Sequence, residues 1–234
     1  MEKCLAIITA RGGSKRIPRK NIKSFLGNPI IKYSIDAALN SQCFKEVMVS
    51  TDDQEIANIA IGLGAKVPFL RSYETSNDFS TTSDVIKETL IEYKKIGKEF
   101  DYVCCIYPTA PFVTAKKLIS AFHIIKSTNA DTVVPVVRYS FPILRSFKIE
   151  LGYLKMNWPE YLNSRSQDLP IAYHDCGQFY FLKTSVFIES NKLFSKYTVP
   201  IEMPESEVQD IDNEEDWIVA EIKYTILLKK QGIV

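Results

Sequence analysis

The residues with the clearest chemical potential lie near the N-terminus, in the stretch ITARGGSKRIPRKN (residues 8–21). Gly12 and Gly13 let the backbone approach a ligand closely, and neighbouring backbone N–H groups form concavities that bind anions. Cationic side chains bind phosphate oxygens, and the stretch carries five of them within ten residues: Arg11, Lys15, Arg16, Arg19 and Lys20. The stretch therefore predicts a polyphosphate site, against the alternatives of a solvated basic loop or a nucleic-acid patch.

The composition of the whole chain argues against a nucleic-acid partner. The 234 residues include 29 Lys+Arg and 28 Asp+Glu, a net charge of +1, whereas nucleic-acid-binding proteins carry a broad basic face. No apolar run approaches the roughly 20 residues that cross a bilayer. The N-terminal apolar stretch is too short for a signal peptide, so we expect a cytoplasmic protein with no membrane partner. The five cysteines form no Cys-x-x-Cys pair, so we expect neither disulfides nor a zinc site.

Short apolar runs alternate with amphipathic stretches along the first 137 residues. We expect strands at 4–10, 45–51, 65–70, 101–107 and 131–137, separated by helices at 28–42, 52–64, 80–97 and 114–127. This alternation predicts an α/β fold, in which helices cover both faces of a mostly parallel sheet. Such sheets bind ligands beyond the carboxyl ends of their strands. The basic stretch begins at such an end.

The pattern changes after Arg138. We expect an apolar hairpin excursion at residues 140–161 that turns at Gly152, a strand at 175–183 that returns to the sheet, and a closing helix. Because no long linker interrupts the chain, we expect a single domain over residues 1–234. Capping boxes are predicted where Asp52 precedes Glu55 and where Asp212 precedes Glu215.

Asp210 and Asp212 are the candidates for a metal site. Carboxylates two residues apart in an extended segment point to the same side, so the pair predicts an Mg²⁺ site. The predicted capping role of Asp212 competes with that prediction. His174 is either a site residue or a structural hydrogen-bonding residue.

Six segments, taken in order, resemble the motifs of the CMP-sugar synthetases, the cytidylyltransferases that activate nonulosonic acids. They are ARGGSKRIPRKN (10–21), VSTDD (49–53), RSYETSNDFSTTSDV (71–85), YPTAPF (107–112), NSRSQDLPIAYHDCGQFY (163–180) and DIDNEEDW (210–217). The resemblance implies a Rossmann-like, three-layer α/β/α nucleotidyltransferase fold similar to GT-A. It also implies transfer of CMP from CTP to the anomeric hydroxyl of a nonulosonic acid, with release of pyrophosphate. Tyr107 stands where sialic-acid members usually have Gln, and residues 164–180 are most similar to the branch that activates pseudaminic acid.

The same resemblance implies roles for individual residues. The catalytic residues would be Arg11, Lys15 and Lys20, which neutralise phosphate charge. The other nucleotide-binding residues would be Ala10, Gly12, Gly13, Ser14, Asn21, Arg71 and Ser83. The acceptor would be bound by Tyr107, Arg165, Gln167, Tyr173 and Gln178, and Mg²⁺ by Asp210 and Asp212. For Arg165, which suits the acceptor carboxylate, the alternative is a salt bridge to Asp168.

The excursion also predicts an assembly. Its large apolar side chains would form a patch larger than soluble monomers usually expose, and the resemblance implies dimers in which each subunit completes the acceptor site of the other. We therefore expect a homodimer, with Arg145 or Lys148 reaching into the partner's site. The alternative is an intramolecular flap that covers one end of the sheet. Alternative functions are synthetases for N-acetylneuraminate, legionaminate or Kdo, a GT-A glycosyltransferase, and a non-enzymatic nucleotide- or RNA-binding module.

Overall fold

A seven-stranded sheet forms the centre of the protein in a computed structural model that describes residues 2–230 and 232. The strand order is β11-β6-β10-β5-β1-β4, and β9 pairs with β6. The strands are β1 (Cys4–Thr9), β4 (Glu46–Ser50), β5 (Tyr102–Ile106), β6 (Thr132–Arg138), β9 (Tyr173–Asp175), β10 (Phe179–Lys183) and β11 (Thr198–Glu202). Only β9 and β10 run antiparallel to their neighbours among these strands. The predicted, mostly parallel sheet is confirmed.

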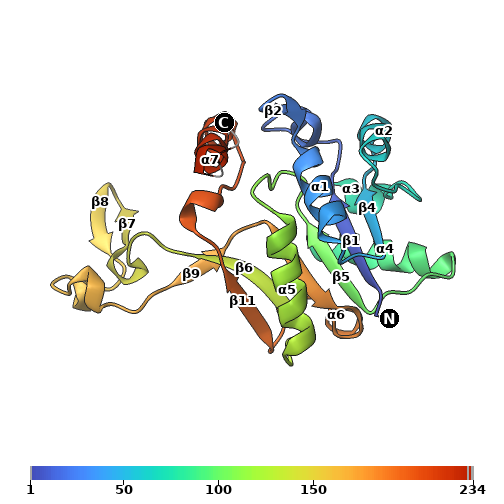
Figure 1. The fold of residues 1–234 in the computed structure, drawn as a ribbon. Coiled ribbons are helices and arrows are strands. Elements are labelled where there is room, and N and C mark those ends of the chain that lie inside the picture. Colours follow the sequence, from blue (N-terminus) through green and yellow to red (C-terminus); the bar gives the residue numbers. More distant parts are fainter. Residues whose placement is uncertain (1, 231, 233–234) are drawn as a thin grey trace.

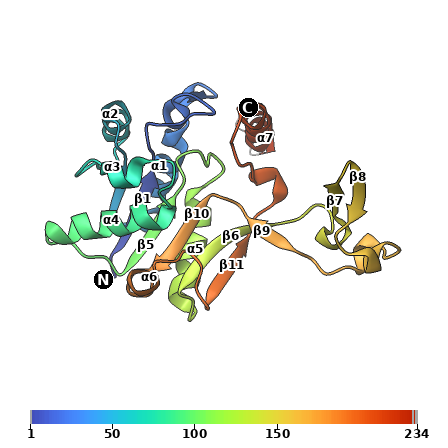
Figure 2. The same cartoon turned by 180° about the vertical axis from the view of Figure 1, so that it is seen from behind.

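Helices cover both faces of the sheet (Figures 1 and 2). α1 (Ile31–Ser41) and α5 (Ala115–Ser127) pack on one face, and α4 (Thr82–Lys95) and α6 (Thr184–Ser190) lie on the other. Successive side chains of β1 point to opposite faces of the sheet, because side chains alternate along a strand. Ala6 and Ile8 join the core with α1 and α5, whereas Leu5 and Ile7 join the core with α4. The continuous apolar run of β1 reflects this burial on both sides.

Several smaller elements complete the chain. α2 (Gln54–Gly62) follows β4, and α3 (Tyr73–Ser76) precedes α4. The last helix that the structure describes is α7 (Glu214–Lys230). β2 (Ser24–Phe25) and β3 (Asn28–Pro29) form a small hairpin after the basic loop. Phe25 of this hairpin packs against Trp217 of α7, with ring centroids 5.7 Å apart. None of the helices in the described residues is long and apolar enough to cross a membrane.

The predicted strand at 65–70 is wrong. Lys66 forms one isolated bridge to Met48, and the chain then leaves the sheet. Pro68 has no N–H to donate, so it cannot extend a strand ladder. β11 and α6 were not predicted, and the helix predicted at 28–42 begins only at Ile31, because Asn28 and Pro29 form β3.

Both predicted capping boxes are wrong by one residue. The N-cap of α2 is Asp53, whose carboxylate accepts hydrogen bonds from the N–H groups of Glu55 and Ile56 at 2.9 and 3.0 Å. At α7, Asn213 Oδ1 accepts from the N–H of Asp216 at 3.0 Å, and the Asp216 carboxylate accepts from the N–H of Asn213 at 3.1 Å. The shift leaves the preceding carboxylates, Asp52 and Asp212, for other partners.

The excursion between β6 and β9 comprises residues 139–172, longer than the predicted 140–161, and stands apart from the rest of the protein (Figure 1). Its strands β7 (Phe147–Glu150) and β8 (Tyr153–Met156) pair as an antiparallel hairpin. Leu151 and Gly152 make the turn with φ angles of 53° and 80°, as a two-residue type I′ turn requires. The side chains of Ile149, Leu151 and Tyr153 are exposed, so this apolar hairpin has no partner within the described residues.

The cap of α7 yields a stability prediction. Asn213→Ala removes the side-chain acceptor for the Asp216 N–H and should lower the free energy of unfolding by about 1 kcal/mol. Asp212→Ala is the matched control, because Asp212 does not cap the helix, and should change it by less than about 0.5 kcal/mol. Urea unfolding followed by circular dichroism measures both. Equal losses in the two variants would contradict this assignment of the cap.

Candidate functional site

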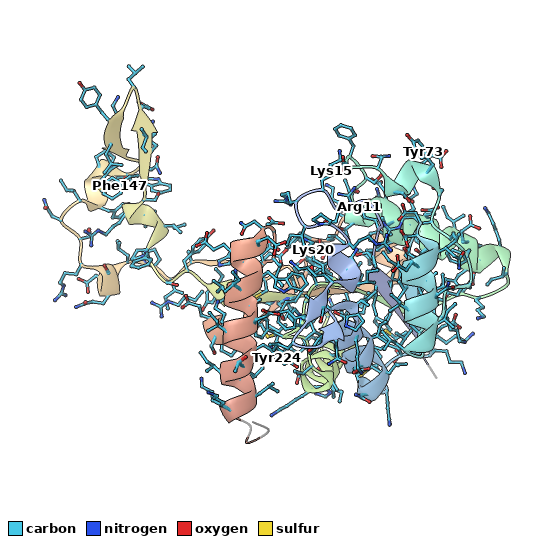
Figure 3. All side chains as sticks on the ribbon, turned by 90° about the horizontal axis from the view of Figure 1, so that it is seen from above. Arg11, Lys15, Lys20, Tyr73, Phe147 and Tyr224 are labelled. Carbon is cyan, nitrogen blue, oxygen red and sulfur yellow. The ribbon has the colours of Figure 1, made fainter. Side chains whose placement is uncertain are left out.

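The basic loop lies over a cavity at the carboxyl edge of the sheet. The cavity has a volume of about 490 Å³ and separates the loop from the segment at residues 75–82. Four cations of the loop line it, Arg11, Lys15, Arg16 and Lys20, together with Arg71 and the polar residues Ser14 and Asn21. Arg11, Lys15 and Lys20 gather on one side of the protein, well away from Phe147 of the hairpin (Figure 3). We call this the polyphosphate cavity.

Two backbone N–H groups of the loop already have hydrogen-bond partners. The N–H of Gly12 donates to Asp52 Oδ1 at 2.8 Å, and the N–H of Ser14 donates to the Gly12 carbonyl at 3.0 Å. A Cβ at Gly12 would lie 2.8 Å from Asp53 Oδ2, so this glycine allows the loop to approach the start of α2. The Gly12 and Ser14 N–H groups are thus unavailable to the predicted anion-binding concavity, and the cavity owes its positive charge to side chains.

Asp78 places a negative charge among these cations. Its carboxylate accepts from Arg11 Nη1 at 2.6 Å and from Lys15 Nζ at 2.5 Å. The hydrogen bonds from Lys15 and Arg11 lower the pKa of Asp78 to about 2. Asp78 therefore competes with any polyphosphate for the charge of both cations. Sequence reasoning missed Asp78, because nothing in the polar segment around it singles out one acid.

Two buried side chains, Asn21 and Arg71, and the partly buried Lys20 fix the rest of the cavity. The Asn21 amide donates to the Arg11 carbonyl at 2.8 Å, and this hydrogen bond connects the two ends of the loop. The Arg71 guanidinium donates to Ser50 Oγ at 3.0 Å and to the Ser50 carbonyl at 2.6 Å, and burial lowers its pKa. Lys20 donates to the Ile211 carbonyl at 2.6 Å, and burial lowers the pKa of this lysine too. Ordered cations of this kind suit an anionic ligand.

Four of the predicted nucleotide-binding residues do not line the cavity. Ala10 is fully buried beneath the loop, and Gly12 and Gly13 are in the loop but outside the lining. Ser83 is buried near the start of α4, whose N-cap is Thr81. Its neighbour Thr82 lines the cavity instead.

Asp210 and Asp212 lie beside Lys20. Burial raises the pKa of Asp210, and the charge of Asp212 raises it further. Asp212 Oδ1 lies 2.8 Å from Arg16 Nη2. Among the residues that the structure describes, no group of three or more His, Cys, Asp or Glu is placed to hold a metal ion. Two carboxylates are enough for Mg²⁺, which takes one or two from the protein and completes its shell with phosphates and water.

A second cavity adjoins the first. Its volume is about 550 Å³, and its lining includes Tyr107, Arg138, His174, Asp175, Tyr180 and Asp210. Tyr107 lines both cavities. Because the two cavities share this side chain, ligands in them would lie next to each other, as a group transfer requires. We call this the acceptor cavity.

Only Tyr107 of the five predicted acceptor residues lines the acceptor cavity. Arg165 and Gln167 belong to the excursion, where Arg165 Nε lies 2.6 Å from Asp168 Oδ2. Tyr173 donates to Glu202 at 3.3 Å. Gln178 is buried and donates to the Glu207 carbonyl at 2.8 Å.

Sequence reasoning missed Arg138, Asp175 and Tyr180 in this cavity. Asp175 and Tyr180 belong to the segment YHDCGQFY, in which only Tyr173, His174 and Gln178 were predicted as site residues. Side chains alternate between the two faces of a sheet, so the pattern along β9 and β10 could have identified them. That inference needs the boundaries of both strands to be known.

Comparison with known proteins agrees with this geometry. Residues 5–200 match the sequence profile of a family described as cytidylyltransferase. A pseudaminic acid cytidylyltransferase of Campylobacter jejuni is 39% identical over 225 residues, which cover 96% of this chain and 97% of the relative. A CMP-N,N'-diacetyllegionaminic acid synthase of Legionella pneumophila is 34% identical over 219 residues, covering 93% of this chain and 94% of that protein.

A solved structure shows the same fold. It is described as CMP:2-keto-3-deoxy-manno-octonic acid synthetase complexed with CTP, and it aligns with 97% of this chain and 100% of its own at a TM-score of 0.69 and 16% identity. This likeness confirms the predicted nucleotidyltransferase fold. The profile match and the full-length relatives lead to one conclusion: the chain belongs to the cytidylyltransferase family.

Proposed function

We propose that the protein transfers CMP from CTP to the anomeric hydroxyl of a nonulosonic acid and releases pyrophosphate. The observation that carries this proposal is the pair of adjoining cavities that share Tyr107, one rich in cations and one suited to a sugar acid. Pseudaminic acid is the proposed acceptor, supported by the Campylobacter jejuni relative. A legionaminic acid derivative is the second candidate, supported by the Legionella pneumophila relative. The cytoplasm remains the predicted location.

The side chains of the polyphosphate cavity have defined tasks in this proposal. Transfer at phosphorus needs positioning and charge neutralisation more than covalent chemistry. Arg11 and Lys15 bind the triphosphate once Asp78 has moved, and they stabilise the charge that grows on the departing pyrophosphate. Lys20 lies at the α-phosphate. The acceptor hydroxyl approaches the α-phosphorus from the side of Tyr107.

Mg²⁺ is the proposed metal, with Asp210 and Asp212 as its protein ligands. The raised pKa of Asp210, due to burial and then to the charge of Asp212, indicates a pair of carboxylates whose repulsion a cation would relieve. When bound, Mg²⁺ shields phosphate charge and makes a nearby hydroxyl more acidic. Lys20 adds a fixed positive charge next to the same carboxylates.

A homodimer is also proposed. The exposed apolar hairpin needs a partner surface, and Arg165 and Gln167 lie on the excursion rather than at the two cavities of their own chain. A second copy of the chain would cover the hairpin, and the excursion of each copy would then bring these residues to the acceptor cavity of the other.

An acceptor panel tests the proposed function. The purified protein is incubated with CTP, Mg²⁺ and one acid at a time: pseudaminic acid, an N,N'-diacetyllegionaminic acid, N-acetylneuraminic acid or Kdo. Pyrophosphate release is followed, and the CMP-linked product is identified by mass. We expect the largest kcat/KM with pseudaminic acid. A larger value with another acid would reassign the acceptor, and no release with any of them would reject the activity.

Substitutions at Lys15 and Asp78 should act in opposite directions on CTP binding. Lys15→Ala should lower kcat/KM by about 10²- to 10³-fold, because a fixed charge at the departing pyrophosphate is lost. Asp78→Asn should lower the KM for CTP roughly two- to tenfold, because a competing anion is removed. Lys192→Ala, at an exposed lysine, is the control. A raised KM in Asp78→Asn would mean that Asp78 holds the cations in place instead.

The proposed metal ligands give a second test. Asp210→Asn should raise the Mg²⁺ concentration needed for half-maximal activity at least about tenfold, and Asp212→Asn should raise it less, because Asp212 is also paired with Arg16. Steady-state rates over a range of Mg²⁺ concentrations measure this. Unchanged metal dependence in both variants would exclude the two carboxylates as ligands.

The dimer is tested by charges placed on the hairpin. Light scattering of the wild-type protein at micromolar concentration should give twice the chain mass of 26.7 kDa. The double variant Ile149→Asp/Leu154→Asp should give the monomer mass, because buried charges destabilise an apolar interface. Loss of the dimer should also reduce activity. A wild-type monomer with full activity would refute the proposal.

A further inference from the structure

The acceptor cavity holds an arginine whose side chain has no partner among the described residues. Arg138 is the last residue of β6 and the only arginine in the lining of this cavity. Its guanidinium makes no hydrogen bond or ion pair within residues 2–230 and 232, so every N–H donor is available to a ligand. The other arginines of the chain each have such a contact: Arg11, Arg16, Arg19, Arg71, Arg145 and Arg165.

Several other charged groups of the cavity are already engaged. The Asp175 carboxylate accepts a hydrogen bond from the Tyr180 hydroxyl, and Glu205 Oε1 accepts one from Ser140 Oγ at 2.6 Å. The Lys223 ammonium donates to a backbone carbonyl at 2.8 Å. Within the described part of the chain, the guanidinium at the end of β6 is therefore the cation of this cavity that gives up no contact when it binds a ligand.

Arg138 and Tyr107 lie two strands apart in the sheet. β6 pairs with β10, and β10 pairs with β5, which ends one residue before Tyr107 (Figure 2). Neighbouring strands lie about 4.8 Å apart, so about 10 Å of sheet separates the two residues, and both line the acceptor cavity. Pairing with Tyr173 in the ladder of β6 and β9 fixes the Arg138 backbone. The cavity thus extends from the residue shared with the polyphosphate cavity to a cation on a fixed strand.

A nonulosonic acid brings a negative charge into this cavity. Its carboxylate is bonded to the anomeric carbon, which also carries the attacking hydroxyl, so the carboxylate lies close to the reacting atoms whatever the rest of the sugar is. Asp175, Glu205 and Asp210 line the same cavity, and their charges repel it. A carboxylate that leaves water needs a cation and hydrogen bonds in compensation. An arginine supplies both through paired N–H···O contacts.

We infer that Arg138 binds the acceptor carboxylate and thereby selects sugar acids over neutral sugars. This inference rests on the proposed function, which supplies the class of acceptor. Two guanidinium N–H groups donate to the two carboxylate oxygens, and these contacts also orient the neighbouring anomeric hydroxyl towards the α-phosphorus. Arg138 is thus a specificity-determining residue that touches the acceptor and takes no part in the transfer of protons or of CMP.

Arg165, the residue that the sequence favours for the carboxylate, has a competitor that Arg138 lacks. Its Nε and Nη2 donate to the Asp168 carboxylate at 2.6 and 3.1 Å. Asp168 belongs to the same 3-10 turn of the excursion, so this competitor accompanies Arg165 wherever the excursion lies. An acceptor carboxylate competes with Asp168 for Arg165, whereas no carboxylate of the described residues pairs with Arg138.

Comparison of an acid with its neutral amide tests the inference. The best acceptor of the panel and its carboxamide have nearly the same shape and differ in charge. Values of kcat/KM for both, at saturating CTP and Mg²⁺, give an acid:amide ratio for each variant. The intrinsic difference in reactivity between the two compounds is the same for every variant. A change of the ratio on substitution therefore reports the contact with the carboxylate.

Substitutions at Arg138 should act on the acid alone. Arg138→Gln should lower kcat/KM for the acid about 10²-fold and leave that for the amide within about threefold, because only the acid loses charge-assisted hydrogen bonds. Arg138→Lys keeps the charge without the planar fork and should lower the value for the acid about tenfold. The KM for CTP should stay within about threefold in both variants, because Arg138 does not line the polyphosphate cavity.

Lys196→Gln is the matched control for the loss of a cation. Lys196 is exposed and lines neither cavity, so this variant should keep the wild-type ratio. Arg165→Gln should also keep the ratio, whatever its effect on the rate. Thermal unfolding confirms that each variant is folded, and Arg138→Lys carries the test should Arg138→Gln not fold.

Three results would overturn the inference. The first is a wild-type protein that uses acid and amide equally well. The second is an unchanged ratio in the Arg138 variants, with equal losses for both compounds, which would mean that Arg138 only shapes the cavity. The third is a larger fall of the ratio in Arg165→Gln than in Arg138→Gln, which would assign the carboxylate to the excursion.

The proposed function fails differently. A folded wild-type protein that makes no CMP-linked product with any acid of the panel contradicts that function and the role of Arg138 with it. An active wild type that gives any of the three results above contradicts the role of Arg138 alone.

Discussion

Neutralisation of the basic loop is the constraint on which the site depends. Five cations within ten residues repel each other, and four of them pair with carboxylates while the fifth, Lys20, donates to a backbone carbonyl. Asp78 serves Arg11 and Lys15, Asp212 serves Arg16, Asp53 and Glu55 serve Arg19, and the Ile211 carbonyl serves Lys20. These partners come from three segments distant in sequence: the turn before α4, the turn after β4, and the segment before α7. Through these contacts the loop holds the three segments around its cavity. The acidic partners also offset its positive charge, so the chain as a whole stays close to neutral.

The same pairing explains what the sequence could predict. The loop, its position after a buried strand and the parallel sheet follow from local patterns, because apolar runs and glycine pairs act over a few residues. The partner of Lys15 lies 63 residues further along the chain, and no periodicity encodes such a pairing. The two capping boxes failed for a related reason. In each case two neighbouring polar residues could serve as the N-cap. The first of them, Asp52 or Asp212, contacts Gly12 or Arg16 instead, and the second caps the helix.

The acceptor side of the site was less predictable than the phosphate side. A phosphate site is marked by charge, which is visible in a sequence, whereas a sugar site is formed by neutral polar groups that look like any others. Gln178 and Tyr180 are two residues apart at β10, yet Gln178 holds the Glu207 carbonyl while Tyr180 lines the cavity. The difference arises because Gln178 precedes the first residue of the strand, where strand alternation does not yet apply.

The hairpin is connected to the sheet by two neighbouring strands. β6 leads into the excursion and β9 leads out of it, and the two are paired at Val137 and His174. Asp175 is the last residue of β9, and Arg138 is the last residue of β6. The two strands that hold the excursion therefore also carry two side chains of the acceptor cavity. Any displacement of the hairpin relative to the sheet would have to be accommodated next to that cavity.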